Sequence, residues 1–379
     1  MLRLQPVRHG AFLLLLAVAF VFAVSCSAQN RTAAKEPGTR ISRIAQPVAY
    51  PDGRPAAKYM LKATDQGIVY RHGNGPAGCD SLGARDIWVW IYKGTYYMHY
   101  DGAGPTGWLA CLATSRDATH WTARGPALDL GGPGSRDSAS ASYGVTFFDG
   151  KKWHLFYLGT PHTSAPPNRV PAFPYLTMKG EASAPTGPWK KRYDITPFTP
   201  RPGTYYSATA SPGQVIPGKK EFMMFFSAST DSPILRTLGI ARTRDLESRW
   251  TIDAQPLVPP TEQVENTSLY YQEQTKTWFL FTDHVGVKNG LEYTDAIWVY
   301  WTQDIEKWNP ENKAVVLDGT TCGWSKEIIG LPSVVKVGNR LAIFYDGYAG
   351  KGIPDGAASH MRRDVGLAWI DLPIATEPQ

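Results

Sequence analysis

The sequence predicts an all-β fold, a five-bladed β-propeller whose ring is closed by an N-terminal strand. A pattern of strand, tight turn, aromatic strand and polar turn recurs from residue 84 onward with a period of about 60 residues. Aromatic residues make up 12% of the chain, which also holds 36 Gly and 30 Pro, and no long stretch has helical periodicity. Such composition is typical of many short strands joined by tight turns. A unit of this length with about four strands is a propeller blade, because a four-stranded sheet buries both faces only between neighbouring blades.

The copies can be followed along the chain. In the first, residues 86–91 and 96–100 have strand composition, the turn Lys93-Gly94 separates them, and Trp121 closes the unit. The other copies occupy residues 143–189, 213–250, 268–308 and 332–370. The tryptophans that close the second to fourth copies are Trp189, Trp250 and Trp308. Three recurring aspartates before closing tryptophans, which we interpret as turn caps rather than catalysts, are Asp117, Asp245 and Asp304.

The fifth copy ends near Pro373 with three recognisable strands. Residues 67–71, with the sequence GIVYR, precede the first copy and belong to none of the five. We predict that this segment supplies the missing outer strand, because the last sheet would otherwise expose an unpaired edge. A free N-terminal arm is the alternative.

The N-terminus predicts export. A basic start, an apolar run over residues 11–24 and small residues at 25–28 together form a secretory signal over residues 1–28. Cys26 and the three residues before it also resemble a lipoprotein cleavage box, which would lipidate Cys26; cleavage after Ala28 is the alternative. The protein is therefore expected in the periplasm, on the cell surface as a lipoprotein, or secreted.

Residues 29–47 are rich in Ala, Arg, Lys, Pro and Thr and predict a flexible tether, and residues 48–379 are the propeller domain. Export permits disulfides. Cys79 precedes the inner strand of the first copy and Cys322 precedes that of the fifth, so ring closure would make them neighbours. We expect a disulfide between these two; three reduced, buried thiols, Cys111 included, are the alternative.

The charge pattern does not predict a nucleic-acid partner. The net charge is +6, but the Lys and Arg residues are scattered, and several lie in the N-terminal 47 residues. The sequence has no phosphate-binding loop, dinucleotide fingerprint or paired-cysteine zinc spacing. We expect no cofactor, and contact with a membrane only through a lipid anchor.

Acidic residues recur where the inner strands begin. In a propeller these ends converge on one mouth of the central channel. Four copies carry an acid at or near this position: Asp86, Asp137, Glu265 and Glu327. Convergent carboxylates in an aromatic mouth suit glycoside cleavage, in which one ionised carboxylate is the base or nucleophile and one protonated carboxylic acid donates to the leaving oxygen.

The repeat motifs resemble those of a known group of enzymes. They are ARD at 84–86, KGTYY at 93–97, LATSRD at 112–117, GIARTRD at 239–245 and FYDG at 344–347. With these motifs the chain, from about residue 80 to residue 373, resembles the five-bladed propeller glycoside hydrolases of families 43, 32, 68 and 117. The resemblance implies that Asp86 is the base or nucleophile and that Asp137 orients substrate and tunes the pKa of the acid.

The general acid departs from that family pattern. The resemblance implies a glutamate at the start of the third copy, but residues 207–212 read SATASP and hold no carboxylate. We predict that Glu265, which enters the fourth inner strand, replaces it. Glu327 and His284 are the alternatives, because a histidine can also donate a proton and family 117 uses an acid other than glutamate.

Other polar and aromatic side chains near the mouth are candidates for substrate binding. They are Trp88, Tyr143, His284, Trp324, His360 and Arg363. Aromatic rings can stack on sugars, and an arginine fork suits a sugar carboxylate or sulfate. Blade packing and surface salt bridging are the alternatives for these residues. The resemblance implies Asp283 and His284 as the place for a central calcium ion; we predict no metal.

The predicted function is hydrolysis of a glycosidic bond in an oligosaccharide or polysaccharide. Two alternatives share the same channel mouth. The first is a propeller that binds carbohydrate without catalysis, which would explain the missing acid in the third copy. The second is a glycoside phosphorylase or transglycosylase.

Overall fold

The computed structural model describes residues 38–47, 50, 52–288, 291–354 and 356–376. The predicted signal peptide lies outside them. Within these residues the regular structure is almost entirely β, and the helices are three short 3-10 turns: η1 (Pro76–Gly78), η2 (Pro260–Glu262) and η3 (Gly356–His360). The all-β prediction is confirmed. In the part of the chain that is described, no helix has the length and apolarity needed to span a membrane.

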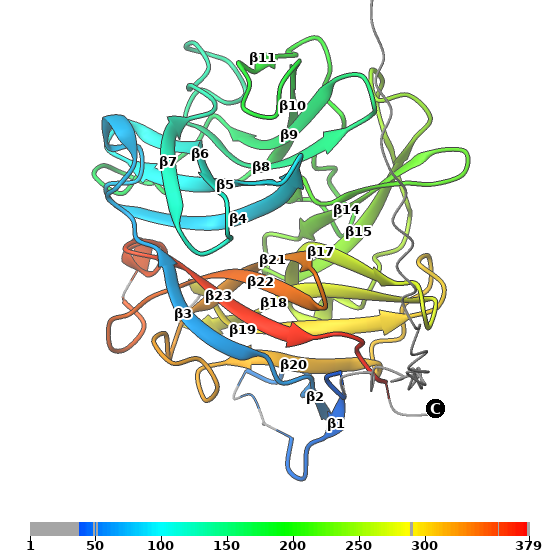
Figure 1. The fold of residues 1–379 in the computed structure, drawn as a ribbon. Coiled ribbons are helices and arrows are strands. Elements are labelled where there is room, and N and C mark those ends of the chain that lie inside the picture. Colours follow the sequence, from blue (N-terminus) through cyan, green and yellow to red (C-terminus); the bar gives the residue numbers. More distant parts are fainter. Residues whose placement is uncertain (1–37, 48–49, 51, 289–290, 355, 377–379) are drawn as a thin grey trace, which may run out of the picture. The chain divides into compact units, whose positions relative to one another are not determined.

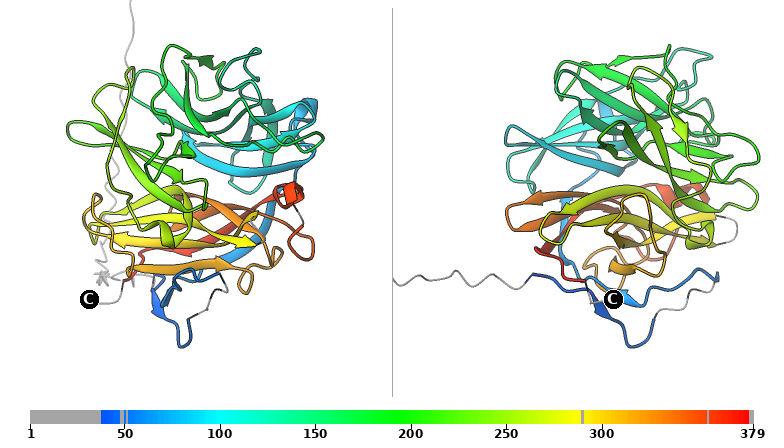
Figure 2. Two further views of the ribbon diagram at one scale, coloured as in Figure 1. Left: turned by 180° about the vertical axis from the view of Figure 1, so that it is seen from behind. Right: turned by 90° about the vertical axis from the view of Figure 1, so that its right-hand side faces the viewer.

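Apart from two short N-terminal strands, the described strands form five consecutive antiparallel groups, here called blades 1 to 5 (Figure 1; seen from two other sides in Figure 2). A short parallel pairing at residues 108–109 and 140–141 links the first two groups. Blade 1 comprises β4 (Gly83–Tyr92), β5 (Thr95–Gly104), β6 (Gly107–Ser115) and β7 (Trp121–Pro126). Blade 2 comprises β8 (Ser140–Phe148), β9 (Trp153–Thr160), β10 (Leu176–Ala182) and β11 (Lys190–Lys191).

The remaining blades follow the same order from the inner to the outer strand. Blade 3 comprises the split inner strand β12 (Thr209–Ser211) and β13 (Val215–Pro217), then β14 (Phe222–Ser229), β15 (Arg236–Thr243) and β16 (Thr251–Ile252). Blade 4 comprises β17 (Val264–Gln272), β18 (Thr277–Lys288), β19 (Leu291–Thr302) and β20 (Lys313–Asp318). Blade 5 comprises β21 (Ile329–Val337), β22 (Arg340–Gly347), β23 (Asp364–Asp371) and β3 (Thr64–Tyr70).

The outer strand of blade 5 comes from the N-terminal side of the chain. β3 pairs antiparallel with β23, with Ile68 opposite Gly366 and Tyr70 opposite Val365 (blue and red in Figure 1). The segment predicted as the missing outer strand therefore occupies that place. Blade 5 also packs against blade 1, because β21 and β22 both contact β4.

The predicted tether is shorter than expected at its C-terminal end. β1 (Ser42–Arg43) pairs with β2 (Tyr59–Met60), which extends the sheet of blade 4 by pairing with β20. Ile41 is fully buried with Leu61 and Ile374. Residues 38–43 are therefore part of the folded domain: β2 covers the edge of β20, and β1 pairs with the outer side of β2, a role that the polar composition of residues 38–43 did not reveal.

The turns form at the residues that the sequence predicted. Lys93 and Gly94, both with positive φ (48° and 72°), form the two-residue turn between β4 and β5, as expected for a hairpin turn of the primed type. The three recurring aspartates accept backbone N–H groups two residues ahead: Asp117 from Thr119 (2.9 Å), Asp245 from Glu247 (2.9 Å) and Asp304 from Glu306 (3.1 Å). Their interpretation as turn caps is confirmed.

Three of the four closing tryptophans join their blade to the one before it. Their ring contacts are Trp121 with Phe344 (centroids 5.6 Å apart), Trp189 with His99 (5.9 Å) and Trp250 with Phe156 (5.6 Å). Each partner lies on the second strand of the preceding blade, and for blade 1 the preceding blade is blade 5. At these three junctions a large ring that meets its partner edge-on fills the space between the blades.

Removing one of these rings should weaken the whole fold. Trp250 is 6% exposed and packs with Phe156 and Phe226 in the cluster between blades 2 and 3. We expect Trp250→Ala to lower the free energy of unfolding by about 3–5 kcal/mol, measured by denaturant titration. Ile91→Ala, at a position 40% exposed, is the control and should change it by about 0.5 kcal/mol or less. Equal effects of both changes would show that the tryptophan does not hold the junction.

The expected disulfide between Cys79 and Cys322 is not formed. Both residues, like Cys111, are buried free thiols. Cys322 hydrogen-bonds to the hydroxyl of Tyr345 (3.4 Å), whereas a hydrogen bond with the thiol of Cys111 lowers the pKa of Cys79. The prediction was wrong because Cys79 lies beside Cys111 of β6 in blade 1, whereas Cys322 lies beside Tyr345 of β22 in blade 5.

Candidate active site

One cavity brings together residues from all five blades. Its volume is about 140 Å³. Of the side chains predicted for catalysis or substrate binding, five line this cavity: Asp86, Tyr143, Glu265, His360 and Arg363. Four further acidic or basic residues line it that the sequence did not single out for the site: Arg85, Asp101, Arg236 and Glu292.

A kink at the same level of the inner strands positions the cavity residues. β4, β8, β17 and β21 each carry a β-bulge there. The bulged residues with positive φ are Asp86 (51°), Tyr143 (34°), Asn266 (60°) and Leu331 (28°). In blade 3 the inner strand breaks instead, at Gly213, where a Cβ atom would lie 1.6 Å from the carbonyl oxygen of Phe225. Bulges re-aim side chains, and here they turn Asp86 and Tyr143 into one cavity.

Each of three bulges is held by a side chain from the second strand of the preceding blade. The pairs are the N–H of Asp86 with Oδ2 of Asp346 (2.9 Å), the N–H of Tyr143 with Oδ1 of Asp101, and the N–H of Asn266 with Oγ of Ser227 (2.8 Å). The acceptors Asp346, Asp101 and Ser227 are buried. These contacts compensate for the ladder hydrogen bonds that a bulge disrupts.

Asp86 is part of a charged pair that extends to a histidine. Arg85 donates from Nε to Oδ1 of Asp86 (2.9 Å) and from Nη1 to Nδ1 of His360 (2.6 Å). Because a guanidinium cannot accept a hydrogen bond, Nδ1 of His360 is unprotonated and Nε2 carries the proton. Burial and the nearby positive charge of Arg85 hold the pKa of His360 well below its usual range, so the ring is neutral and Nε2–H is a donor. The Asp86 side chain remains 17% exposed.

Glu265 and Glu292 share one arginine. Arg236 binds Glu292 with two parallel hydrogen bonds, from Nε (2.6 Å) and Nη2 (2.8 Å), and its Nη1 lies 3.0 Å from Oε2 of Glu265. Burial raises the pKa of Glu265, Arg236 opposes the rise, and the charges of Glu292 and Asp86 add to it. The side chains of Glu265 and Glu292 are 16% and 17% exposed, so solvent reaches both carboxyl groups.

Hydrogen bonds within the protein fix the orientation of the Arg363 side chain. Its Nη1 donates to Oδ1 of Asp346 (2.6 Å) and to Oγ1 of Thr294 (3.2 Å), and its side chain is 1% exposed. Asp346 thus connects Arg363 to the bulge at Asp86. All three cavity arginines are paired with carboxylates, so none of them offers an unneutralised positive charge to a substrate.

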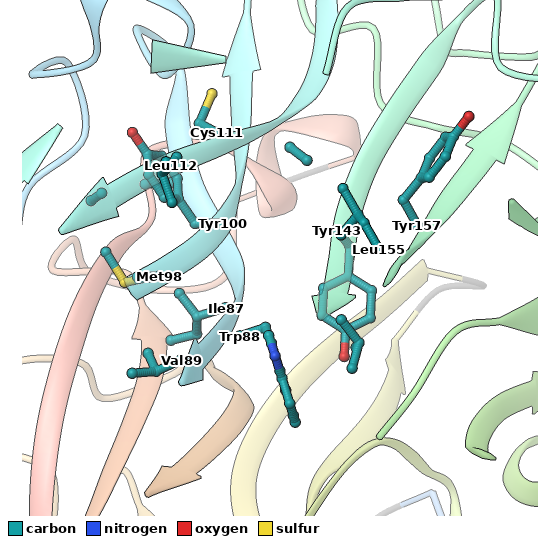
Figure 3. Close-up of a cluster of buried hydrophobic side chains, with 14 of the residues drawn as sticks. Ile87, Trp88, Val89, Met98, Tyr100, Cys111, Leu112, Tyr143, Leu155 and Tyr157 are labelled. Carbon is teal, nitrogen blue, oxygen red and sulfur yellow. The ribbon is translucent and has the colours of Figure 1, made fainter. Parts of the chain in front are cut away.

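Tyr143 combines a strained backbone with a buried hydroxyl group. A bulky residue at φ 34° is rare and is held there only when the surroundings require it. Among the described residues its hydroxyl has no hydrogen-bond partner. Burial, together with the charges of Asp86 and Asp101, raises the pKa of Tyr143 well above its usual value, so the group is a neutral phenol. Figure 3 shows Tyr143 of β8 and Trp88 of β4 among the buried side chains where blades 1 and 2 meet.

Asp137 lies away from the cavity. It is fully buried, and its carboxylate accepts hydrogen bonds from Lys191 (2.6 Å), Tyr157 (2.8 Å) and Ser135 (2.9 Å). Burial acts to raise the pKa of Asp137, but the hydrogen bonds from Lys191 and Tyr157 outweigh it, and the net direction is downward. In this arrangement Asp137 ties the loop before β8 to β9 and β11.

His284 also lies away from the cavity, beneath the N-terminal segment. Its Nδ1 is within hydrogen-bond distance of Arg54 (3.0 Å) and Asp295 (2.9 Å), and its ring stacks on Trp298 (centroids 3.9 Å apart). Burial lowers the pKa of His284. Asp283, the residue before it, instead accepts a hydrogen bond from Asn266 (3.0 Å), which lines the cavity.

The two predicted tryptophans are packing residues. The indole N–H of Trp88 donates to Thr146 (3.1 Å), and that of Trp324 donates to the hydroxyl of Tyr345 (2.7 Å). Glu327, the alternative acid, is exposed and does not line the cavity.

One cluster of metal-ligand types occurs among the described residues, at His154, Glu181 and Glu247. Its carboxylates already form ion pairs with Lys152, Lys179 and Arg192. Three cations at the two carboxylates make this cluster a salt-bridge network rather than a cation site.

Comparison with solved structures identifies the fold. The chain is similar in structure to the catalytic domain of a GH62 α-L-arabinofuranosidase from Coprinopsis cinerea (TM-score 0.57, 12% identity, covering 82% of this chain and 96% of that chain). It is also similar to a thermostable family-43 glycoside hydrolase (TM-score 0.54, 13% identity, 82% and 98% covered). A third similar structure is Zg3597, a family 117 glycoside hydrolase of the marine bacterium Zobellia galactanivorans (TM-score 0.52, 13% identity, 82% and 91% covered). The fold is that of the propeller glycoside hydrolases.

The resemblance stated from the sequence motifs is thus confirmed at the level of the fold. No protein-family model matches the chain, and no curated protein is similar to it in sequence.

Proposed function

We propose that this protein is a glycoside hydrolase that uses Asp86 as base or nucleophile and Glu265 as general acid. The observation that carries the proposal is that these two carboxyl groups line one solvent-reached cavity in contrasting surroundings. Asp86 is paired with Arg85, whereas burial and neighbouring carboxylates raise the pKa of Glu265. A carboxyl group with a raised pKa, beside a second carboxyl group in the same cavity, is what a general acid requires.

The proposed reaction uses the cavity as follows. Glu265, protonated, donates its proton to the glycosidic oxygen as the bond to the leaving group breaks. Asp86, ionised, attacks the anomeric carbon or removes a proton from the water that does so, and the positive charge that develops on the sugar ring is stabilised by its carboxylate. The Nε2–H of His360 and the hydroxyl of Tyr143 are neutral donors suited to sugar hydroxyl groups.

Arg236 of blade 3 supports the proposal that the general acid is carried by blade 4. The third blade carries no glutamate on its inner strand, but Arg236, on β15 of that blade, reaches Glu265 (3.0 Å). The guanidinium fixes the position of the carboxyl group, and Glu292 neutralises the guanidinium, so that Glu265 is not held permanently ionised. Ser211, near the position where the relatives have the acid, still lines the cavity.

The test of the proposal is release of reducing sugar or of 4-nitrophenol by the wild-type protein. The panel comprises 4-nitrophenyl furanosides and pyranosides with linear arabinan, β-1,3-galactan and agaro-oligosaccharides. We expect turnover of at least one member without added phosphate. Saturable binding of a glycan without any product across pH 4–9 would instead support a carbohydrate-binding propeller, and turnover only with phosphate would support a phosphorylase.

The pH profile tests the role of Glu292. Because the acid must be protonated, activity should fall as pH rises through the pKa of Glu265. Glu292→Gln removes a nearby negative charge and leaves Arg236 to interact with Glu265 alone; both effects lower the pKa of Glu265. We therefore expect the alkaline limb of kcat/KM against pH to move to lower pH while the acidic limb stays in place.

Glu311→Gln is the matched control, because Glu311 is exposed and pairs with Lys58. It should leave both limbs unchanged. A Glu292→Gln profile that is lower at every pH but not displaced would contradict the tuning role and indicate a structural one.

A further inference from the structure

A loop of blade 2 joins blades 1 and 2 beside the cavity. Residues 161–175 connect β9 to β10. The indole N–H of Trp108, on β6, donates to the carbonyl oxygen of Asn168 in this loop (2.9 Å). Trp108 lines the cavity together with Val170 and Pro171 of the loop. The gap between these two blades is therefore covered.

The next two gaps are covered by cavity residues as well. Between blades 2 and 3, the N–H of Tyr175 donates to the carbonyl oxygen of Ala208 (3.1 Å), and the N–H of Ala210 donates to that of Tyr175 (3.1 Å). Between blades 3 and 4, Arg236 binds Glu265. Tyr175, Arg236 and Glu265 all line the cavity.

The remaining two gaps complete the wall. Between blades 4 and 5, Thr294 accepts a hydrogen bond from Arg363 (3.2 Å), and between blades 5 and 1, Arg85 donates to His360 (2.6 Å). All four residues line the cavity. Contacts between lining residues or their loops thus join all five pairs of neighbouring blades around the cavity. Together they form a continuous wall, which favours a pocket for one chain end over a groove.

The volume sets how much of a substrate fits. A buried cavity of roughly 150 Å³ holds one benzene molecule, a single six-membered ring. The cavity here measures about 140 Å³. Its volume therefore corresponds to about one sugar ring.

We propose that the enzyme acts only on chain ends, with one terminal sugar residue seated in the cavity and the rest of the chain outside the mouth. The proposal rests on the proposed glycosidase function and adds the substrate class. Glu265 and Asp86 then flank the first glycosidic bond from the end, and each turnover transfers one water across that bond and releases one monosaccharide.

The test follows the early products of the wild-type protein on linear arabinan and β-1,3-galactan, by chromatography and viscometry. We expect a monosaccharide as the sole early product with unchanged viscosity. Oligosaccharides whose terminal sugar carries a benzyl ether should be cleaved at least about tenfold more slowly. A ladder of oligosaccharides with falling viscosity would overturn chain-end action while the glycosidase function stands. Failure to cleave any polysaccharide or aryl glycoside would overturn both.

A loop variant tests whether the wall causes the restriction. Thr163 and Pro171 pair across the base of the loop, so residues 164–170 can be replaced by Asn-Gly, which favours a two-residue turn. If its thermal unfolding remains cooperative, this variant should cleave the benzylated oligosaccharides at least about tenfold faster than the wild type. A cooperatively folded variant that excludes them as the wild type does would contradict the assigned role of the wall.

Discussion

Asp86→Asn is expected to lower kcat/KM by about 10²–10⁴-fold or more on every substrate, whatever its leaving group. The amide has nearly the shape of the carboxylate, but it can neither attack the anomeric carbon nor take a proton from water. Asn is also the substitution that suits the backbone, because it tolerates the positive φ of 51° that Asp86 adopts. Its carbonyl oxygen can still accept the hydrogen bond from Arg85.

The melting temperature should therefore stay within a few degrees of the wild type, which separates loss of chemistry from loss of fold. Asp194→Asn is the control, since Asp194 is 65% exposed and pairs with Arg192 outside the cavity. Steady-state kinetics and thermal unfolding of the three proteins decide the matter. Activity of Asp86→Asn within tenfold of the wild type would remove Asp86 from the mechanism.

Glu265→Gln should show an effect that depends on the leaving group. A sugar or alkoxide leaving group needs a proton as the bond breaks, so loss of the acid should reduce its kcat/KM by about 10²–10⁴-fold. A 4-nitrophenolate leaves without protonation, and the same variant should retain far more activity on the aryl glycoside. The ratio of the two losses is the quantity to measure.

We also expect the pH profile of Glu265→Gln to lose its alkaline limb, because the group whose deprotonation ends activity is gone. Glu306→Gln, at an exposed residue that pairs with Arg242, provides the comparison. Equal losses on both kinds of substrate would assign Glu265 to positioning and leave the acid to another cavity residue.

Local sequence signals predicted the blades well, because each depends on a few neighbouring residues. Lys93-Gly94 predicts a hairpin turn through the backbone freedom of glycine, and Asp117 caps a turn with hydrogen bonds to residues three or fewer positions away. The strand GIVYR was placed correctly by counting strands rather than by its own composition. The predicted tether wrongly included residues 38–43. The burial of Ile41 depends on partners that are distant in sequence, so composition alone does not reveal it.

Some of the residues predicted for the site line the cavity and others do not. Asp86 and Glu265 line it, because both sit at the start of an inner strand, a position that the repeat makes visible. His284 was misplaced by a single position: neighbouring residues of a strand face opposite sides, so Asp283 turns toward Asn266 while His284 turns toward Arg54. Asp137 was misplaced because its partner, Lys191, is distant in sequence.

By itself the sequence determined the all-β architecture, the period of the blades, the recurring tryptophans and the position of Asp86 at the start of the first inner strand. These features follow from short-range chemistry repeated along the chain. Only the tertiary structure decided which charges meet in the cavity. Arg236 and Glu292 are 56 residues apart and carry no motif, yet they form the pair that surrounds Glu265. A pKa depends on burial and on charges within a few ångströms, and those distances exist only after the blades have packed.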